Sequence, residues 1–308
     1  MQRSWIVSEG DSGDRLDVAL AALADITRSQ ARRWIEAERV TLNAGAARAS
    51  QRVQEGDIVT AEPPDPLPSP LTPEPIALAV LYEDADLIVI DKPAGLVVHP
   101  GPGHASGTLV NALLHHCGDL AGVGGVLRPG IVHRLDRGTS GVMLAAKHDA
   151  AHAHLSAQFR EHSIEREYRA LVRGVPTADA GRVDRAIGRH RSERKRMSVH
   201  TAAGREAHTA WRVLRRFSEA ECSWLSVLPE TGRTHQIRVH LASVGLPIMG
   251  DPVYGRRGAK AGAALARPAL HAARLGFEHP TSGARMAFEA VLPADLTALL
   301  AALEAGER

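Results

Sequence analysis

The sequence predicts an α+β protein, with a mixed, largely antiparallel sheet in a large domain and a small α+β module at the N-terminus. Three observations support this. Strand-like segments recur after residue 76, helical patterns are fewer and irregularly spaced, and a proline-rich stretch separates the two parts. Strands without regularly interposed helices favour the α+β class over a doubly wound fold. The 308 residues, 44% of them hydrophobic, suffice for one large and one small domain.

The stretch 63–75 is the clearest domain boundary, because it holds seven of the eighteen prolines in the chain. Proline lacks a backbone N–H and has a fixed φ, so such a segment cannot form a helix and makes a stiff, extended spacer. We therefore predict an N-terminal domain over residues 1–62, a linker over 63–75 and a large domain over 76–308.

The N-terminal module shows a helix over 29–38, with Ala31, Trp34 and Ile35 spaced for one buried face, and strands over 40–42 and 57–61. It resembles the S4 RNA-binding domain in Arg15-Leu16-Asp17, in this helix and in Glu55-Gly56-Asp57. The module has eight Arg against ten Asp or Glu, so RNA binding would depend on arginines gathered on one face. The candidates are Arg28, Arg32 and Arg39.

The large domain contains recurrent apolar runs of strand length and a few longer amphipathic segments. We predict strands at 87–90, 141–146, 167–172, 223–227 and 286–291, and helices at 108–116, 150–161, 234–244 and 295–305.

Several classes of protein are excluded by what the sequence lacks. No secretory leader or membrane-length apolar run is present, which indicates a soluble, cytoplasmic protein. Cys117 and Cys222 are too few for a disulfide framework or a four-cysteine zinc site, and we predict no metal. The glycines at 101, 103 and 107 are too irregular for a dinucleotide fingerprint, so we also expect no cofactor. No long heptad pattern appears, so a monomer is the default.

The segment 182–216 is strongly basic, with eleven Arg or Lys against three acidic residues. Such a run is typical of a surface that faces RNA phosphates, although a solvated charged face explains it equally well. Its densest part supplies the candidate RNA-binding residues Arg191, Arg194, Lys195 and Arg196.

Asp136 is the leading candidate for a reactive carboxylate. It lies between Arg134 and Arg137, in a loop rich in Gly and Ser that leads into an apolar strand. Nearby positive charge favours an ionised carboxylate, which is a competent nucleophile. Taken alone, however, the local pattern favours a structural aspartate that caps the turn 137–140.

Four separated sequence motifs favour a reactive Asp136 over a structural one. The loop HRLDRGTSG at 133–141 resembles the signature loop of the RluA-type pseudouridine synthases, and other blocks of that family occur in the expected order. These blocks are LYEDADLIVIDKPAGLVVHP at 81–100, REYRALV at 166–172, and TGRTHQIRVH at 231–240 with GDPVYG at 250–255. The resemblance covers nearly all of the chain after the linker, and the two-domain layout is closest to that of the ribosomal large-subunit enzymes of the family.

The resemblance implies that Asp136 is the essential carboxylate of an enzyme that isomerises uridine within RNA without a cofactor. Whether Asp136 attacks the ribose, adds to the base or removes a ribose proton stays open. The target base must be flipped out of its stack, at a cost of a few kcal/mol. The resemblance assigns Arg134 to the vacated space, with a salt bridge or phosphate contact as the alternative. It places Tyr168 against the flipped base.

Further roles also follow from the resemblance. Arg233 matches the arginine that pairs with the catalytic carboxylate. Lys92 matches a residue that shapes the pocket wall, where a structural role is favoured over a chemical one. His133 and Ile237 complete the expected substrate-binding residues.

The expected partner is RNA, with large-subunit ribosomal RNA as the first substrate and transfer RNA as the second. Three alternatives stay open: a noncatalytic RNA-binding protein, a nucleoside hydrolase or N-glycosidase, and a ribosome-assembly factor. The hydrolase would release free uracil, whereas an isomerase conserves mass.

Overall fold

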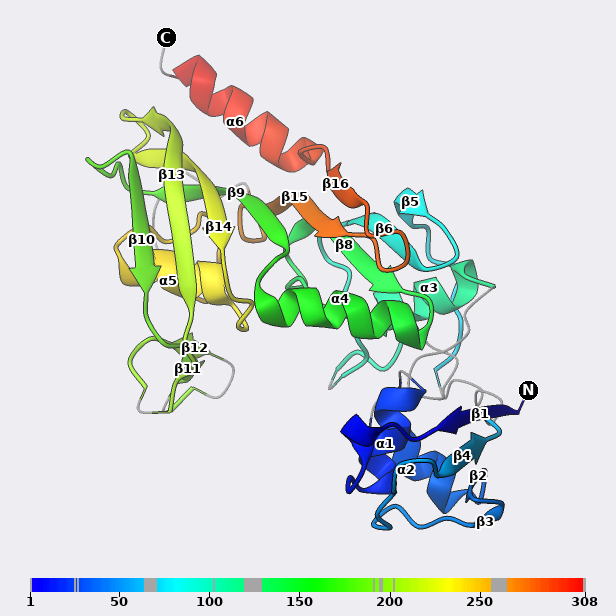
Figure 1. The fold of residues 1–308 in the computed structure, drawn as a ribbon. Helices are drawn as coiled ribbons and strands as arrows, with labels where there is room; N and C mark the ends of the chain where they lie inside the picture. The colour runs from blue at the N-terminus through cyan, green and yellow to red at the C-terminus, as the bar shows by residue number, and fades with distance from the viewer. Residues whose placement is uncertain are drawn as a thin grey trace.

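The chain folds into two units, each around its own hydrophobic core, as the computed structural model shows (Figure 1). The structure describes residues 2–306 except positions 25, 27, 64–70, 102, 119–128, 191, 194, 195, 202 and 256–264. Most of the prolines in the predicted linker 63–75 therefore lie outside the described residues. Within the part of the chain that is described, no helix is long and apolar enough to cross a bilayer.

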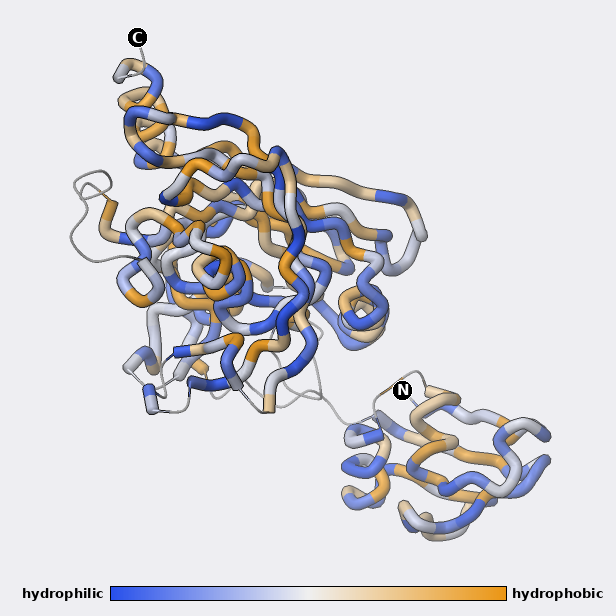
Figure 2. The backbone as a smooth tube through the Cα atoms, turned by 90° about the vertical axis from the view of Figure 1, so that its left-hand side faces the viewer, coloured by the Kyte–Doolittle hydropathy of each residue, from blue (hydrophilic) through white to orange (hydrophobic). Residues whose placement is uncertain are grey.

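The N-terminal unit is a four-stranded antiparallel sheet packed against two helices, with the strand order β1-β4-β2-β3. Figure 2 shows it standing apart from the larger unit. Its elements are β1 (Arg3–Ile6), the short 3-10 helix η1 (Glu9–Asp11), α1 (Leu16–Leu23), α2 (Arg28–Glu36), β2 (Val40–Leu42), β3 (Gly45–Ala46) and β4 (Ile58–Ala61).

Helix α2 forms because its apolar residues recur at helical spacing. Ala31 and Ile35 are buried, as predicted, and Trp34 packs half-buried at the edge of the same core. The helix also contacts the larger unit, because the Gln30 side-chain amide donates to Asp149 Oδ2 at 2.6 Å. Gln30 is 3% exposed, so this contact between the two units is shielded from water.

The larger unit is built on a ten-stranded sheet with the main order β10-β13-β14-β9-β15-β8-β6-β5, to which β16 adds beside β15 and β7 beside β8. Only β15 and β8 pair in parallel, so the predicted mixed, largely antiparallel sheet is confirmed. The strands are β5 (Ala79–Glu83), β6 (Leu87–Lys92), β7 (Gly130–Ile131), β8 (Ser140–Ala146), β9 (Glu165–Arg173), β10 (Ala180–Asp184), β13 (His208–Phe217), β14 (Cys222–Pro229), β15 (Leu270–Glu278) and β16 (Arg285–Glu289), with β11 (Gly188–Arg189) and β12 (Met197–Ser198) in a separate hairpin.

Four helices flank this sheet, and all four were predicted, with ends that differ by at most two residues. Helix α4 packs on β7 and β8, while α5 packs on β13 and β14 (Figure 1). Thr108 caps α3 in a capping box with Asn111, which explains why that helix begins where it does. The helices are α3 (Leu109–His116), α4 (Asp149–Glu161), α5 (Gln236–Ser243) and α6 (Ala294–Gly306).

Two long strands, β13 and β15, were missed by the sequence analysis. Strand β13 does alternate, with Thr209 and Trp211 buried and Arg212 exposed, but the charge of the segment masked its period. Strand β15 lies in the middle of the sheet between β9 and β8, so buried residues follow one another in it without alternation.

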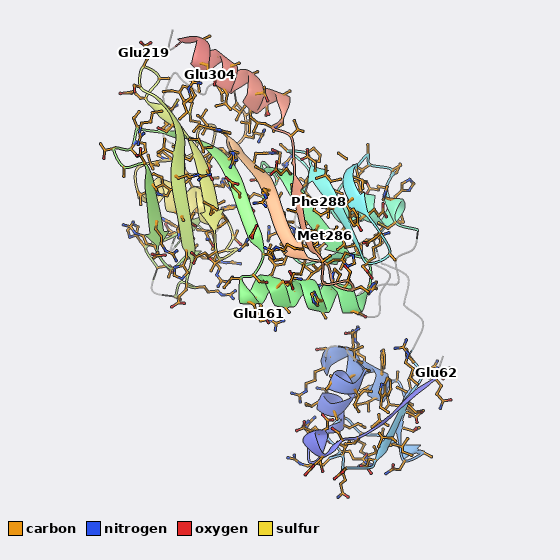
Figure 3. The ribbon with its side chains drawn as sticks, turned by 45° about the horizontal axis from the view of Figure 1, so that its top comes forward. Glu62, Glu161, Glu219, Met286, Phe288 and Glu304 are labelled. Atoms are coloured by element: carbon orange, nitrogen blue, oxygen red, sulfur yellow. The ribbon has the colours of Figure 1, made fainter. Side chains whose placement is uncertain are left out.

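The basic segment 182–216 differs from the predicted phosphate-facing patch. Half of the basic residues that the structure describes in it are neutralised, because four arginines of the eight pair with carboxylates. Figure 3 shows Glu304, one of these acids, on α6 at the end of the molecule where Glu219 also lies. The pairs join Arg182 to Glu230 and Asp184, Arg196 to Glu193, Arg215 to Glu304, and Arg216 to Asp179. For this part of the segment, the solvated, ion-paired face is therefore the better description.

A polar cluster joins the β5–β6 turn to the end of β15. Asp84 accepts hydrogen bonds from the Tyr82 hydroxyl at 2.7 Å and from the Leu87 N–H at 2.9 Å, and its Oδ2 lies 2.7 Å from His279 Nε2. Burial alone would raise the pKa of Asp84, but these hydrogen bonds outweigh it and lower the pKa to about 2. The ionised carboxylate therefore stabilises the fold.

We expect Asp84→Asn to remove a pH-dependent part of the stability. Since the pKa of Asp84 is lowered by folding, its contribution is complete above pH ~4, the unfolded pKa, and is lost as pH falls through about 2. The difference in free energy of unfolding between wild type and variant should be about 2 kcal/mol larger at pH 6 than at pH 2. Urea titrations at several pH values measure it, and a difference that does not change with pH contradicts the assignment.

We expect Gly141→Ala to be strongly destabilising. Gly141 has φ +117° where β8 meets β15, and a Cβ there would lie 2.7 Å from the Ala272 carbonyl carbon and closer still to its oxygen. The predicted loss is at least about 3 kcal/mol, because backbone atoms cannot move aside as a side chain can. Gly283→Ala is the matched control: its φ is +68° but the space around it is open, so it should lose only about 1–2 kcal/mol. Equal losses in the two variants would show that the clash is absent.

Candidate active site

A cavity of about 610 Å³ opens where the loop after β7, the end of α4, strand β9 and the turn before α5 meet. Its volume is in the range of sites that hold a small molecule or a single nucleotide. Asp136 is the only acidic residue among the described residues that line it, whereas six arginines do so. These arginines are Arg134, Arg160, Arg166, Arg205, Arg233 and Arg238. The cavity is therefore suited to a polyanion with one carboxylate at its wall.

The side chain of Asp136 faces the cavity and does not cap its own turn. The Asp136 main-chain oxygen accepts from the Thr139 N–H at 3.0 Å, which closes the turn through the backbone. Its carboxylate oxygen Oδ2 instead accepts from Arg238 Nη1 at 2.9 Å, and the side chain stays 18% exposed. The purely structural interpretation of Asp136 is thus not needed to explain the loop.

Arg238, on α5, is held by a second carboxylate. Its Nε and Nη2 donate to the two oxygens of Asp251 at 2.7 and 2.8 Å, in a bidentate pair whose carboxylate is completely buried. Burial opposes the charge of Arg238, but the pairs with Asp251 and Asp136 raise its pKa overall. The ring of Tyr254 packs 5.1 Å from the guanidinium carbon. Asp136 therefore faces a cation of fixed orientation.

The sequence analysis chose the wrong arginine as the partner of Asp136. Arg233 lies in the turn before α5, where its Nε donates to the Glu206 main-chain oxygen at 3.0 Å. Arg238 lies in the helix itself, and helical side chains point back toward the N-terminus, which here is the cavity. Both arginines occur in the same block TGRTHQIRVH, so charge and motif alone could not separate them.

His235 and Tyr254 are two further site residues that the sequence analysis did not single out. His235 adopts a left-handed conformation, with φ 57°, directly before α5. Its Nδ1 lies 2.9 Å from the Tyr254 hydroxyl, and its Nε2 lies 3.9 Å from Asp136 Oδ2. Burial lowers the pKa of His235, although Asp136 opposes the shift. The only sequence signal was their position in the matched blocks at 231–240 and 250–255.

The structure brings six of the predicted site residues to this cavity, namely His133, Arg134, Asp136, Tyr168, Arg233 and Ile237. Tyr168 is half-buried on β9, and burial raises the pKa of its hydroxyl, which therefore keeps its proton at neutral pH. Ile237 is 7% exposed. Arg134 is exposed at the mouth, and its long side chain has room to move.

His133 lines the cavity, whereas Lys92 does not. His133 Nε2 accepts from the Leu144 N–H at 3.0 Å and its ring stacks on Phe159, so its proton is on Nδ1. Burial, and then the charge of Arg166, lower its pKa to about 3. Lys92 is completely buried and donates to the Pro93 and Leu96 oxygens at 2.8 and 3.0 Å. It does not line the cavity, which agrees with a structural role.

Of the predicted RNA-binding residues, the four that the structure describes, Arg28, Arg32, Arg39 and Arg196, do not line this cavity. Arg191, Arg194 and Lys195 lie outside the described residues. Arg196 pairs with Glu193 and packs 5.7 Å from the Tyr254 ring centre. The three predicted arginines of the N-terminal unit are paired within that unit, in the pairs Arg28–Asp17, Arg32–Glu36 and Arg39–Glu62.

The geometry agrees with comparisons against known proteins. The family model for RNA pseudouridylate synthase matches residues 86–243, which contain Asp136, Tyr168 and Arg238. The chain belongs to this family. A model of the S4 domain matches residues 14–59 of this pseudouridine synthase, in the N-terminal unit. The predicted resemblances to both are confirmed, and the chain is an isomerase that acts on RNA.

Relatives match this pseudouridine synthase over nearly its whole length. An uncharacterized RNA pseudouridine synthase of Bacillus subtilis is 44% identical over 95% of both chains. The ribosomal large subunit pseudouridine synthase D of Zymomonas mobilis is 44% identical over 96% of both, and that of Pseudomonas aeruginosa is 42% identical over 98% of this chain and 96% of its own. Among solved structures, human RNA pseudouridylate synthase domain containing 1 matches with a TM-score of 0.57 and 26% identity, over 75% of this chain and 98% of its own.

We expect Asp251→Ala to destabilise the protein by about 3–5 kcal/mol, because it leaves the buried Arg238 without its main counter-charge. Thermal and chemical unfolding measure this loss. Asp179→Ala is the matched control, since Asp179 also pairs with an arginine but is 89% exposed, and it should change stability little. If the two variants are equally stable, the Asp251–Arg238 pair does not hold the site together.

Proposed function

We propose that this pseudouridine synthase converts specific uridines of large-subunit ribosomal RNA to pseudouridine, with Asp136 as the essential carboxylate. The observation that carries the proposal is the placement of Asp136. It is the one acidic side chain among the described residues of a cationic cavity, and a doubly paired Arg238 fixes its orientation. The names of the Zymomonas and Pseudomonas relatives support the choice of ribosomal RNA. Such a substrate is met in the cytoplasm.

The reaction breaks the bond between uracil N1 and ribose C1′, turns the base and joins C1′ to C5. No atom is gained or lost, because the proton that leaves C5 is balanced by one gained at N1. The protein must therefore position the base and the ribose, stabilise the developing charge and allow this proton transfer. Asp136 can reach a nucleotide in the cavity because its side chain is 18% exposed there. Arg238 balances the negative charge of the carboxylate and limits its rotation.

Entry of the target nucleotide requires base flipping, since a stacked base cannot reach a cavity wall. We propose that Arg134 fills the space that the base leaves, because it is exposed at the mouth two residues before Asp136. Tyr168 and Ile237 then offer the base an aromatic and an aliphatic surface. Arg160, Arg205 and Arg233 are placed to meet phosphates of the flanking RNA.

We expect Asp136→Asn to abolish pseudouridine formation while leaving the fold and RNA binding intact. The variant keeps the size of the side chain but removes its charge, and Asp136 is only one of two carboxylates that hold Arg238. The measurement is mass spectrometry after pseudouridine-specific labelling of ribosomal and transfer RNA incubated with either protein.

The outcomes of this experiment separate the possibilities. Label at defined sites of large-subunit RNA, absent with the variant, supports the proposal. Label confined to transfer RNA would overturn the choice of substrate, and normal label with Asp136→Asn would overturn the role of the carboxylate. Asp179→Asn, far from the cavity lining, serves as the control and should label as wild type does.

A further inference from the structure

Arg166 lines the cavity but has no role in the reaction as described so far. It lies on β9 two residues before Tyr168, and residues two apart on a strand face the same side of the sheet. Both line the cavity. Burial raises the pKa of Tyr168 and lowers that of His133, and the charge of Arg166 opposes the first shift and adds to the second.

The contacts of Arg166 leave most of its donors unused. Nη2 donates to the Glu230 main-chain oxygen at 2.6 Å, and the guanidinium carbon lies 5.7 Å from the Phe159 ring centre. Its Nε is buried and has no hydrogen-bond partner among the described residues. A guanidinium has five N–H donors, so a ligand can still be bound.

No carboxylate among the described residues forms an ion pair with Arg166. Glu230, whose main-chain oxygen accepts from Arg166, has both of its carboxylate oxygens paired with Arg182. Arg166 therefore differs from Arg238, which is paired with two carboxylates in the same cavity. Burial lowers the pKa of Arg166, yet an arginine remains charged at neutral pH.

A partly buried cation without a counter-charge destabilises the folded protein, and such a group persists where a ligand supplies the missing charge. The position of the guanidinium is also fixed. A Cβ at position 232 would lie 3.1 Å from Arg166 Nη1, so Gly232 leaves the room that this group needs. The site is thus organised before any ligand arrives.

We propose that Arg166 is the oxyanion-binding group of this active site, and that it donates to a uracil carbonyl oxygen as negative charge develops there. The inference rests on the proposed function. When the N1–C1′ bond breaks, its electron pair stays on uracil and the charge spreads to the carbonyl oxygens. When C5 bonds to C1′, the pair is used again, the proton on C5 leaves and N1 gains one, so the composition is unchanged.

The base is favoured over a phosphate as the source of the oxyanion because Arg166 lies beside the aromatic rings of Tyr168 and Phe159. A planar base can pack against such rings, whereas a phosphate gains little from them. Donors placed where charge develops act most strongly in such partly buried surroundings. Arg160, by contrast, is exposed on the same cavity and suits a phosphate of the RNA chain.

The test compares Arg166→Met and Arg166→Lys with wild type, in the full-length protein with a large-subunit RNA fragment that the wild type modifies. We expect Arg166→Met to lower the single-turnover rate at saturating RNA by about 10²–10³-fold, while the Kd for RNA changes less than about threefold. Arg166→Lys should recover part of the rate, and ethylguanidinium added to Arg166→Ala should restore some activity.

Thermal stability is a second measurement, and it distinguishes an oxyanion-binding role from a merely structural one. Because Arg166 has no counter-charge, the Tm of Arg166→Met should equal or exceed that of wild type. Arg285→Met is the matched control: this arginine pairs with Glu165 on the sheet edge, outside the cavity lining, and its loss should leave rate and Kd unchanged.

Three outcomes would overturn the inference. A normal saturated rate with a Kd weakened about tenfold, and a salt slope reduced by about one, would assign Arg166 to a phosphate. A fall in Tm that accounts for the lost activity would make it structural. Wild-type rate and affinity in Arg166→Met would leave it without a role. Failure of the wild-type protein to form pseudouridine in any RNA would instead refute the proposed function.

Discussion

The bidentate pair between Arg238 and Asp251 is the interaction on which the active site depends. Asp251 is completely buried at its side chain and also accepts from the N–H groups of Val253 and Tyr254, so it cannot turn away. Arg238 is thereby fixed, and its remaining Nη1 is directed at Asp136. One buried carboxylate thus positions a second, partly exposed one, across 115 residues of chain between Asp136 and Asp251.

The cavity contains two kinds of arginine, which differ in whether carboxylates pair with them. Arg238 has two carboxylates and acts as a fixed support, because its charge is already balanced. Arg166 has none among the described residues, so its charge is available to a ligand. Under the proposed roles, the same residue type serves for positioning in one place and for binding in another, and the carboxylates around it set the difference.

Several arginines that the sequence predicted to bind RNA are paired with carboxylates in the structure. Arg28, Arg32 and Arg39 are paired within the N-terminal unit, and half of the described basic residues of the segment 182–216 are paired as well. Whereas Arg28 pairs with the buried Asp17, pairs with two exposed partners, such as Arg32–Glu36 and Arg39–Glu62, contribute only about 0–1 kcal/mol. A phosphate can therefore replace such a carboxylate at small cost, whereas the buried Asp251–Arg238 pair cannot be exchanged in this way.

The sequence by itself determined the α+β class, the four helices of the large unit and the choice of Asp136. The class and the helices follow from local periodicity, and Asp136 stands in a contiguous block of residues. The sequence also placed Tyr168, Ile237 and Arg134, which the fold brings to one cavity. The strands β13 and β15 were not predicted. Charged residues obscured the alternation of β13, and burial on both faces removed it from β15.

Only the tertiary structure decided which arginine meets Asp136 and which one is left unpaired. Arg233 and Arg238 carry the same charge five residues apart, and the choice between them depends on where α5 begins and on the distant Asp251. Arg166 looks like any other arginine in a strand until the carboxylate of Glu230 is seen to face Arg182. Pairing depends on distance and burial in three dimensions, which local sequence does not specify.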